Sequence, residues 1–579
     1  MKYSADIKKL PRHFLPADFV VTNWETLEPY FKELLDRSIT SDEDLRQWLK
    51  DQSELEAVIN EDACWRQINM TRDTANKNLE EQFNFFCLEI QPKIQPYADA
   101  LNKKLVNHPL TKNLNPERYF TYLRNIRKSI ELFREENIPV QAEIAVLQQQ
   151  YGQVSGEMTI EINGNEYTLQ QAGKFLENED RSLRESVYRK IQERRLQDRE
   201  QLSNLFNKLT GLRNKLAENA GFASYTDYRF KELGRFDYGK LECFQFHDAV
   251  KQQVLPLVNR IYERKQKMLG VERLYPWDLE AEPAGIMPLH PFKTGKELLE
   301  KSIACFNELD PFFGECLKKM NSLQHLDLES RKGKAPGGYN CPLAESGAPF
   351  IFMNAAGQMH DVTTMVHEGG HAIHSFLSHP LELSGFKEYP MEIAEVASMA
   401  MELFSMEYWD QFFENTDDLR RAKIHQLERV ITIFPWIAVI DKFQHWIYSH
   451  PNHTNNERTD AWKSILAEFQ DNVIDYSGLE AYRSNSWQRQ LHLFEVPFYY
   501  IEYGIAQLGA IGLWMQFREN RQQALTNYCE ALKLGGTKTL PELYQAAGLP
   551  FNFSPERIKT LMEFVKEEME KLENTTNFH

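Results

Sequence analysis

Residues 363–376 read TTMVHEGGHAIHSF, and the expectations for the rest of the chain follow from this stretch. His367, Glu368 and His371 form the pattern H-E-x-x-H, which binds zinc when it lies on a helix. Residues four apart share one helical face, so both imidazoles can point at one ion. Glu368 lies beside them, where its carboxylate can take a proton from bound water. Asp361 is expected to cap this helix, and Pro380 to end it.

Two glycines, Gly369 and Gly370, separate the two histidines. Each glycine inside a helix costs about 1 kcal/mol relative to alanine. Helical geometry puts Gly370 on a flank of the metal, where another backbone can approach, whereas Gly369 points away from the metal. We therefore expect Gly370→Leu to abolish activity, and Gly369→Ala to be tolerated or stabilising.

A second helix is predicted within residues 387–409, KEYPMEIAEVASMAMELFSMEYW, and it is apolar nearly all round, as in a buried helix. Glu395 and Glu402 lie on one stripe of it, and a buried carboxylate is costly without a partner. We assign Glu395 to the metal and Glu402 to the second nitrogen of a ligand histidine. Pairing with lysine or arginine is the alternative for both, and Glu388 and Glu392 are weaker ligand candidates.

Composition limits the classes of partner. The 579 residues carry a net charge of −17 and no long basic run, so nucleic acid is not an expected partner. The longest apolar stretches, 430–440 and 504–517, are too short to span a bilayer and are predicted to be buried helices. Seven scattered cysteines and no secretory signal favour a cytoplasmic protein that does not bind membranes.

Most of the chain has helical periodicity, as in 41–70 and 179–220. An exception is 157–171, where apolar and polar residues alternate around Asn163-Gly164, which predicts a β-hairpin. We place a boundary near residue 200, between an N-terminal helical lobe (1–200) and a catalytic domain (201–579).

A second exception is the Gly- and Pro-rich segment 331–362, which contains one strand candidate, PFIFMN (349–354), and leads into the zinc helix. A short β-sheet is therefore expected next to that helix. An extended peptide could pair with this strand through backbone hydrogen bonds, and Gly337 and Gly338 would leave backbone accessible to it. Ordinary loop packing is the alternative.

HEGGHAIHS (367–375), followed by EIAEVASMAMEL (392–403), resembles the thimet oligopeptidase and oligoendopeptidase F family of zinc metallopeptidases, closest to the oligoendopeptidase F branch. Further similar stretches are RKGKAPGGYN (331–340), PFIFMN and LHLFEVPFYYIEYGIAQLG (491–509). The resemblance implies a mostly helical, two-lobed body with a deep substrate channel. It also implies one zinc ion per chain.

In that family pattern His367, His371 and Glu395 hold the zinc and Glu368 is the base. By the same resemblance, His492 and Tyr503 look like the groups that donate hydrogen bonds to the oxyanion of the tetrahedral intermediate, each worth about 3 kcal/mol. Tyr500 lies nearby as a substrate-binding candidate. The alternative is that the tyrosines after Pro497 are aromatic core on a helix.

We expect a zinc endopeptidase that cleaves internal bonds of short, unstructured peptides, as a monomer or a weak homo-oligomer. One alternative is an exopeptidase, a peptidyl-dipeptidase or carboxypeptidase, on the same zinc helix. Another is a helical scaffold without activity, in which H-E-x-x-H is accidental. Metal content and the position of the cleaved bond distinguish the three.

Overall fold

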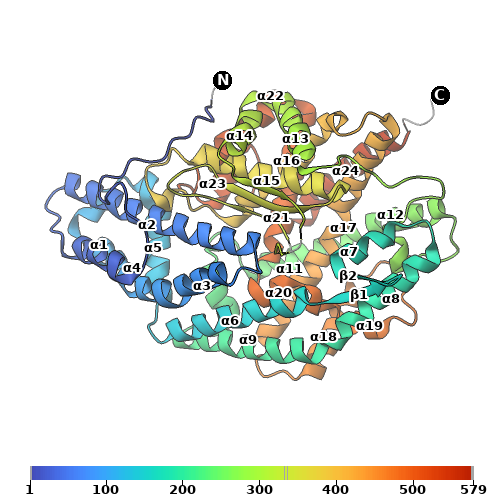
Figure 1. Ribbon diagram of the computed structural model, residues 1–579, viewed down its shortest axis with the longest axis horizontal. Coiled ribbons are helices and arrows are strands. Elements are labelled where there is room, and N and C mark those ends of the chain that lie inside the picture. The colour runs from blue at the N-terminus through green and yellow to red at the C-terminus, as the bar shows by residue number, and fades with distance from the viewer. Residues whose placement is uncertain (1–2, 332, 336, 575–579) are drawn as a thin grey trace. The chain divides into compact units, whose positions relative to one another are not determined.

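The computed structural model describes residues 3–331, 333–335 and 337–574, and most of them are helical (Figure 1). The chain divides into two compact units, each assembled from three stretches. The first unit comprises Met1–Glu135, His290–Ala422 and Ala506–Phe551, and the second comprises Glu136–Leu289, Lys423–Ile505 and Asn552–His579. The expected boundary near residue 200 lies inside Glu136–Leu289, the first stretch of the second unit.

The first unit is built mainly from helices. They are α1 (Trp24–Asp36), α2 (Asp42–Arg72), α3 (Lys77–Phe85), α4 (Gln91–Asn107), α5 (Pro116–Leu132), α13 (Gly295–Leu309), α14 (Pro311–Ser322), α15 (Met359–Ser378), α16 (Met391–Ser405), α22 (Arg521–Lys533), α23 (Leu540–Ala546) and most of α21 (Tyr500–Glu519). The predicted helix at 41–70 is α2. It begins after Ser41, whose hydroxyl accepts a hydrogen bond from the Asp44 amide while the Asp44 carboxylate accepts one from the Ser41 amide.

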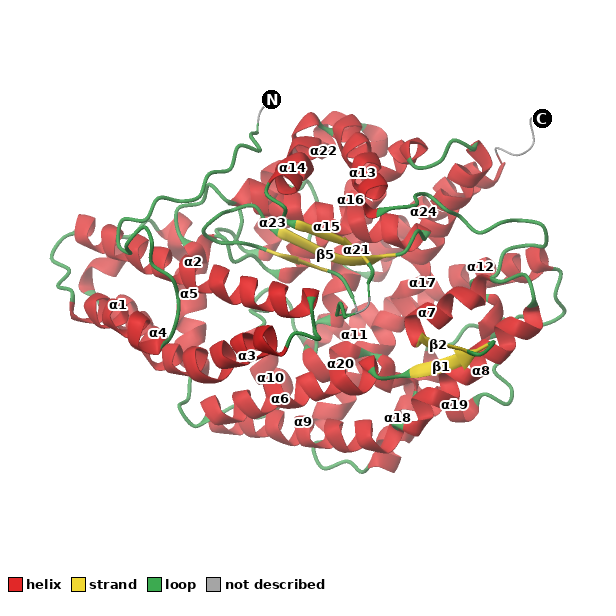
Figure 2. Ribbon diagram, in the orientation of Figure 1, coloured by secondary structure: helices red, strands yellow, loops and turns green. Residues whose placement is uncertain are grey.

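A three-stranded sheet lies against α15 in this unit, with its strands in the order β3 (Leu326–Glu329), β5 (Phe350–Ala355), β4 (Tyr339–Cys341) (Figure 2). β5 is the predicted strand; it pairs in parallel with β3 and antiparallel with β4. Almost all of its residues are buried. The short sheet expected next to the H-E-x-x-H helix is therefore confirmed, and the predicted strand is its central one.

The second unit is also helical. Its helices are α6 (Asn137–Gly156), α7 (Leu169–Gly173), α8 (Arg181–Gln197), α9 (Arg199–Asn219), α10 (Tyr225–Glu232), α11 (Lys240–Ala249), α12 (Leu255–Leu269), most of α17 (Thr416–Ser449), α18 (Asn455–Glu468), α19 (Glu480–Ser484), α20 (Leu491–Glu495) and α24 (Pro555–Asn574). The segment 179–220, predicted to be helical, forms α8 and α9 with a break at Asp198.

The predicted hairpin is present in the second unit. β1 (Thr159–Ile162) pairs antiparallel with β2 (Asn165–Thr168), with Ile162 opposite Asn165. Asn163 and Gly164 both have positive φ, 53° and 78°, as the tight turn between two strands requires. Ile160 and Ile162 are buried against α8, which fixes the face of the hairpin that packs inward.

The two long apolar stretches lie within helices. Residues 430–440 belong to α17 and residues 504–517 to α21, and most of their apolar side chains are buried. Among the residues that the structure describes, none of the helices combines the length and apolar character needed to cross a membrane.

Candidate metal centre

Helix α15 carries His367, Glu368 and His371 on neighbouring positions of its surface. It begins one turn before Asp361, at the cap residue Gln358. The expectation that Asp361 is the cap itself is wrong by three positions. Its carboxylate still stabilises the helix start, because it accepts hydrogen bonds from the amides of Gln358 (2.9 Å) and Ala356 (2.8 Å).

Helix α16 packs along α15 and presents Glu395 and Glu402, which are 3% and 6% exposed. Gly370 allows the close approach of the two backbones. A Cβ atom added there would lie 2.5 Å from the carbonyl oxygen of Ala397 and 2.6 Å from Cα of Ser398. The backbone that approaches Gly370 is therefore that of the helix bearing Glu395.

Three ligand-type atoms converge between these helices. Oε2 of Glu395 lies 3.4 Å from Nε2 of His367 and 3.6 Å from Nε2 of His371. The three residues can offer atoms that all lie within 4.8 Å of one another. Two imidazole nitrogens and one carboxylate oxygen are the donor set of many catalytic zinc sites, which keep a further position for water or substrate. The residues present thus fit a zinc ion.

Two further contacts orient the ligand side chains. Nδ1 of His367 lies 2.7 Å from Oε1 of Glu402, which leaves its Nε2 facing Glu395. The hydroxyl of Ser398 donates to Oε2 of Glu395 at 3.0 Å. A carboxylate on the far nitrogen of a ligand histidine fixes the ring and raises its basicity. Glu402 holds the position expected for it from the sequence.

Burial and the carboxylates set the pKa values in this cluster. Burial alone lowers the pKa of His367, but its contacts with Glu395 and Glu402 outweigh burial and raise the pKa well above the ordinary value. Burial lowers the pKa of His371 to about 4. Burial, together with the charges of Glu395 and Glu402, raises the pKa of Glu368 to about 7, whereas the charge of His367 acts in the opposite direction.

The second glycine, Gly369, has a packing role that the sequence did not reveal. A Cβ atom added there would lie 2.6 Å from Cζ of Phe306 on α13, a ring that is fully buried. The expectation that Gly369→Ala is tolerated or stabilising is therefore revised. The ring fills the space in front of Gly369, and a methyl group there displaces it.

His492, Tyr500 and Tyr503 gather in the second unit. The His492 ring centroid lies 4.8 Å from that of Tyr500 and 5.7 Å from that of Tyr503. Tyr499 joins them, 6.0 Å from His492, and all four side chains are partly exposed. Burial raises the pKa of Tyr500 to about 12, so this phenol keeps its proton and can donate a hydrogen bond near neutral pH.

Three arginines hold the backbone that leads to this cluster, and sequence reasoning missed them. Arg213 donates to the carbonyl oxygens of Leu493 and Phe494, Arg229 to that of Pro497 and Arg235 to that of Phe498. Arg235 also pairs with Glu502 at 2.9 Å, with both side chains buried. Phe498 has a φ of 65°, which is unusual for a residue with a side chain. Contacts across more than 250 residues leave no local signal in the sequence.

The proposed pairing of substrate with PFIFMN needs a correction. Both edges of β5 are occupied, by β3 and β4, so a peptide cannot add to that strand. β4 lies at the edge of the sheet, directly after the exposed Gly337 and Gly338. The Asn340 side chain anchors β4 to the zinc helix, because its Nδ2 donates to the carbonyl oxygen of Glu368 at 3.2 Å.

Comparison with known proteins identifies similar chains over most of the length. A family model described as peptidase family M3 matches residues 174–562, and one described as the peptidase M3 N-terminal domain matches residues 14–133. An oligoendopeptidase F homolog of Borreliella burgdorferi is 22% identical, over 86% of this chain and 85% of its own. Oligopeptidase PepF of Bacillus subtilis is 24% identical, over 71% of this chain and 60% of its own.

Solved structures with the same fold include PZ peptidase A with an inhibitor. It is 26% identical, with a TM-score of 0.90 over 96% of this chain and 99% of its own. Oligoendopeptidase F from Enterococcus faecium has a TM-score of 0.64 over 95% of this chain and 97% of its own, at 17% identity. The mostly helical fold is therefore shared with peptidases of this kind.

Proposed function

Because this chain belongs to peptidase family M3, we propose that it is a zinc-dependent endopeptidase that hydrolyses internal bonds of short, unstructured oligopeptides. The family makes the chain a peptidase, and its oligoendopeptidase relatives support oligopeptides as the substrates. Zinc as the metal, internal cleavage and the roles of individual residues are the proposed parts.

The proposal rests mainly on the short distances between the candidate ligand atoms of His367, His371 and Glu395. Their candidate ligand atoms come from two helices and lie within 4.8 Å of one another, with Glu368 next to them on α15. An accidental H-E-x-x-H on a scaffold helix has no reason to face a buried glutamate from a second helix. The buried Glu402 behind His367 adds a contact typical of metal sites.

The metal supplies Lewis acidity, which polarises a peptide carbonyl and lowers the pKa of a water molecule to about 7. Glu368 takes the proton of the attacking water and passes it to the leaving amine. Burial raises the pKa of Glu368, which favours the protonated form that can pass a proton to the leaving amine. We propose His492 and Tyr503 as the hydrogen-bond donors that stabilise the oxyanion, with Tyr500 as a substrate contact.

For substrate binding we propose the edge strand β4 in place of β5. A peptide in extended conformation would pair with the backbone of β4, and the exposed Gly337 and Gly338 leave that backbone unobstructed. Backbone pairing tolerates many side chains, which suits an enzyme that acts on varied oligopeptides. Folded proteins do not present such an extended segment.

We also propose a cytoplasmic location, short peptides as the substrates, no nucleic-acid or membrane partner, and a monomer or weak homo-oligomer. All seven cysteines are free thiols, as is usual in a reducing compartment. The net charge of −17 makes nucleic acid an unfavourable partner.

Cleavage of a peptide blocked at both ends tests the proposal. The peptide carries an acetylated N-terminus, an amidated C-terminus and a different residue at each position, so that mass spectrometry identifies the cleaved bond. We expect cuts at internal bonds, loss of cleavage with a zinc chelator, and recovery when zinc is restored. Cleavage of the unblocked peptide only, within one or two residues of an end, would show an exopeptidase instead.

A further inference from the structure

Two helices of the second unit each carry a pair of metal-ligand residues four positions apart. α11 carries Cys243 and His247, and α17 carries Asp441 and His445. Residues at i and i+4 lie on one helical face, so each pair projects in one direction. Pairs of ligands on facing helices are the usual way in which helical proteins build metal sites. None of these residues belongs to the candidate metal centre on α15 and α16.

The two pairs face each other in the interior of the unit. Cys243 and Asp441 are fully buried, and His247 and His445 are 1% and 7% exposed. Cys243, Asp441 and His445 can offer ligand atoms that all lie within 4.8 Å of one another. Oδ2 of Asp441 lies 2.9 Å from Nε2 of His247 and 3.4 Å from Nε2 of His445.

Several polar atoms of this cluster have no hydrogen-bond partner among the residues that the structure describes. They are Oδ1 of Asp441, Nε2 of His445 and Nδ1 of His247. An unsatisfied buried polar atom costs about 1–3 kcal/mol, so the atoms of Asp441 and His445 together indicate a group that satisfies them. His247 contacts Oδ2 of the carboxylate, and Oδ1 is the oxygen that remains without a hydrogen-bond partner among the described residues.

We propose that Cys243, Asp441 and His445 form a second metal site, selective for zinc and similar divalent transition metals, and that His247 orients the Asp441 carboxylate. Thiolate, imidazole and carboxylate together are a zinc donor set, whereas magnesium and calcium prefer oxygen ligands alone. Thiolate and carboxylate balance the two positive charges of the ion, and binding releases the proton of the Cys243 thiol to solvent. The metal links α11 to α17.

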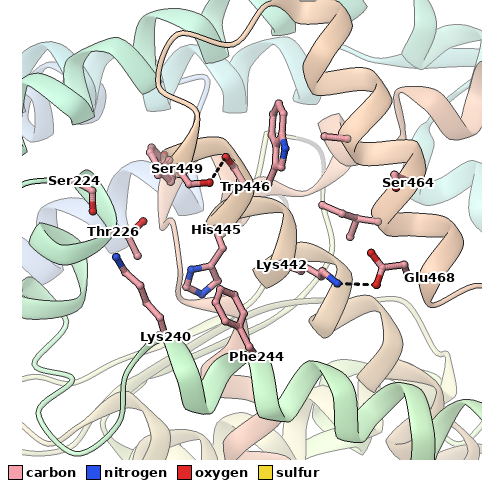
Figure 3. A pocket seen from close by; sticks show the side chains of 13 residues that line it. Ser224, Thr226, Lys240, Phe244, Lys442, His445, Trp446, Ser449, Ser464 and Glu468 are labelled. Carbon is pink, nitrogen blue, oxygen red and sulfur yellow. Dashed lines mark hydrogen bonds and ion pairs between the residues drawn. The ribbon is translucent and has the colours of Figure 1, made fainter.

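A cavity provides a route for the ion. It has a volume of about 470 Å³, and its lining includes Phe244 and Lys240 of α11 together with His445 of α17. In Figure 3 the His445 ring points from α17 toward α11 and lies beside Phe244. The two ring centroids are 4.9 Å apart. Of the four cluster residues, His445 is the one that lines this cavity, so it connects the cavity to the cluster.

Cobalt(II) substitution tests the site without depending on catalysis. Cobalt bound to a cysteine thiolate has a charge-transfer absorption in the near ultraviolet, and the His367, His371, Glu395 centre contains no sulfur. We expect this band in the wild-type protein and in the full-length variant His367→Ala/His371→Ala. Cys243→Ser should abolish the band, and Cys316→Ser, which changes another fully buried cysteine, should keep it.

Zinc content gives a second readout on the same proteins. We expect two zinc ions per chain in the wild type and one in Cys243→Ser, with helical circular dichroism unchanged. His247→Gln should keep the cobalt band but weaken the affinity about 10–100-fold, as expected for a residue that orients a ligand. The proposal would be overturned if the wild-type chain held a single zinc ion and showed no thiolate band, which would leave water as the occupant of the cluster. It would also be overturned if the band persisted in Cys243→Ser, because another cysteine would then be the ligand.

Discussion

At the scale of single residues, the proposed role of Glu402 is to orient a candidate ligand, His367, without binding the metal itself. Its carboxylate lies 2.7 Å from Nδ1 of His367 and fixes the ring for Nε2 to bind. We predict that Glu402→Gln lowers zinc affinity about 10–100-fold, because an amide holds the imidazole less strongly. Competition with a coloured chelator measures this affinity. Glu414→Gln, at an exposed position, is the control, and equal affinities in the two variants would contradict the role of Glu402.

The two glycines of the zinc helix should respond differently to added volume. At Gly370 a Cβ atom meets backbone atoms of α16, which cannot move without separating the two helices. We predict that Gly370→Leu loses both zinc and peptidase activity. Gly369→Ala should keep zinc but lower the free energy of unfolding by about 1–3 kcal/mol, because the Phe306 ring must shift.

Gly211 on α9 is the control for helix propensity. A Cβ atom there meets nothing within 4 Å, so Gly211→Ala should stabilise the protein by about 0.5–1 kcal/mol. Chemical denaturation of the three variants measures these differences. Stabilisation by Gly369→Ala of the same size as by Gly211→Ala would show that Phe306 does not constrain this position.

Spacing along the chain was enough to find the candidate ligands that the structure brings together. The i, i+4 histidines and a carboxylate inside an apolar helix are local signals, and they led to His367, His371 and Glu395. The contact of Gly369 with Phe306 joins positions 63 residues apart and has no such signal. The Asp441 and His445 pair, by contrast, has helical ligand spacing that could have been recognised within 430–450.

At the scale of secondary-structure elements, β3 is fixed by a cluster of charges around Asp327. Arg72, Arg331 and Lys334 all donate to its carboxylate, at 2.6–2.8 Å. Burial alone raises the pKa of Asp327, but these hydrogen bonds outweigh burial and hold the pKa well below its usual range. Lys334 also binds carbonyl oxygens of Glu329 and Met353, so the cluster ties the loop before β4 to the sheet.

We predict that Asp327→Asn lowers the free energy of unfolding by about 3 kcal/mol at pH 7. This value is at the low end of the range for breaking a buried ion pair, because Arg72 and Arg331 are partly exposed. A carboxyl whose pKa is lower in the folded than in the unfolded state stabilises the protein at pH values above its pKa in the unfolded chain, about 3.9. That contribution is lost as the pH falls through the pKa of the folded state. The difference between wild type and variant should therefore shrink below about pH 4. Denaturation at several pH values measures it, with exposed Asp18→Asn as the control. A difference independent of pH would exclude this mechanism.

Elements with strong local signals were predicted, and those that depend on partners were not. Asn163-Gly164 supports two positive φ angles and so determined the hairpin. β5 was found because four consecutive apolar residues, 350–353, stand within a Gly- and Pro-rich segment. β4 has only three residues, one of them polar, and becomes a strand by pairing with β5. The order of strands in this sheet, and hence the correct edge for a substrate, depends on that pairing.

At the scale of the whole molecule, each compact unit is assembled from segments far apart in sequence. The composition of the chain does not change at the borders of these segments in a way that would predict the arrangement. Two of the crossings between the units lie inside helices, α17 and α21, so helical periodicity continues through them, whereas the other crossings lie between helices. The fold class was therefore predictable from periodicity and from the resemblance, whereas the interleaving of the units was not. The deep channel and the division at residue 200 stay predictions.

Metal removal should affect the stability of the whole chain. A ligand at 100 times its Kd stabilises the native state by about 2.7 kcal/mol if it does not bind the unfolded chain. We predict that chelation lowers Tm by a few degrees, and that zinc restores it together with peptidase activity. Differential scanning calorimetry with and without chelator measures the shift. An unchanged Tm with full activity would contradict a zinc-dependent enzyme.

The role of Glu368 gives the most direct test of the proposed chemistry. Glu368→Gln removes the proton acceptor but none of the three ligands. We expect zinc content equal to the wild type and cleavage of the end-blocked peptide reduced by at least about 100-fold, since proton transfer contributes roughly 10²–10⁴-fold. Zinc content and cleavage rate should be measured on the same preparation. If Glu368→Gln binds zinc and cleaves the peptide at the wild-type rate, Glu368 is not the base and the proposed mechanism is wrong.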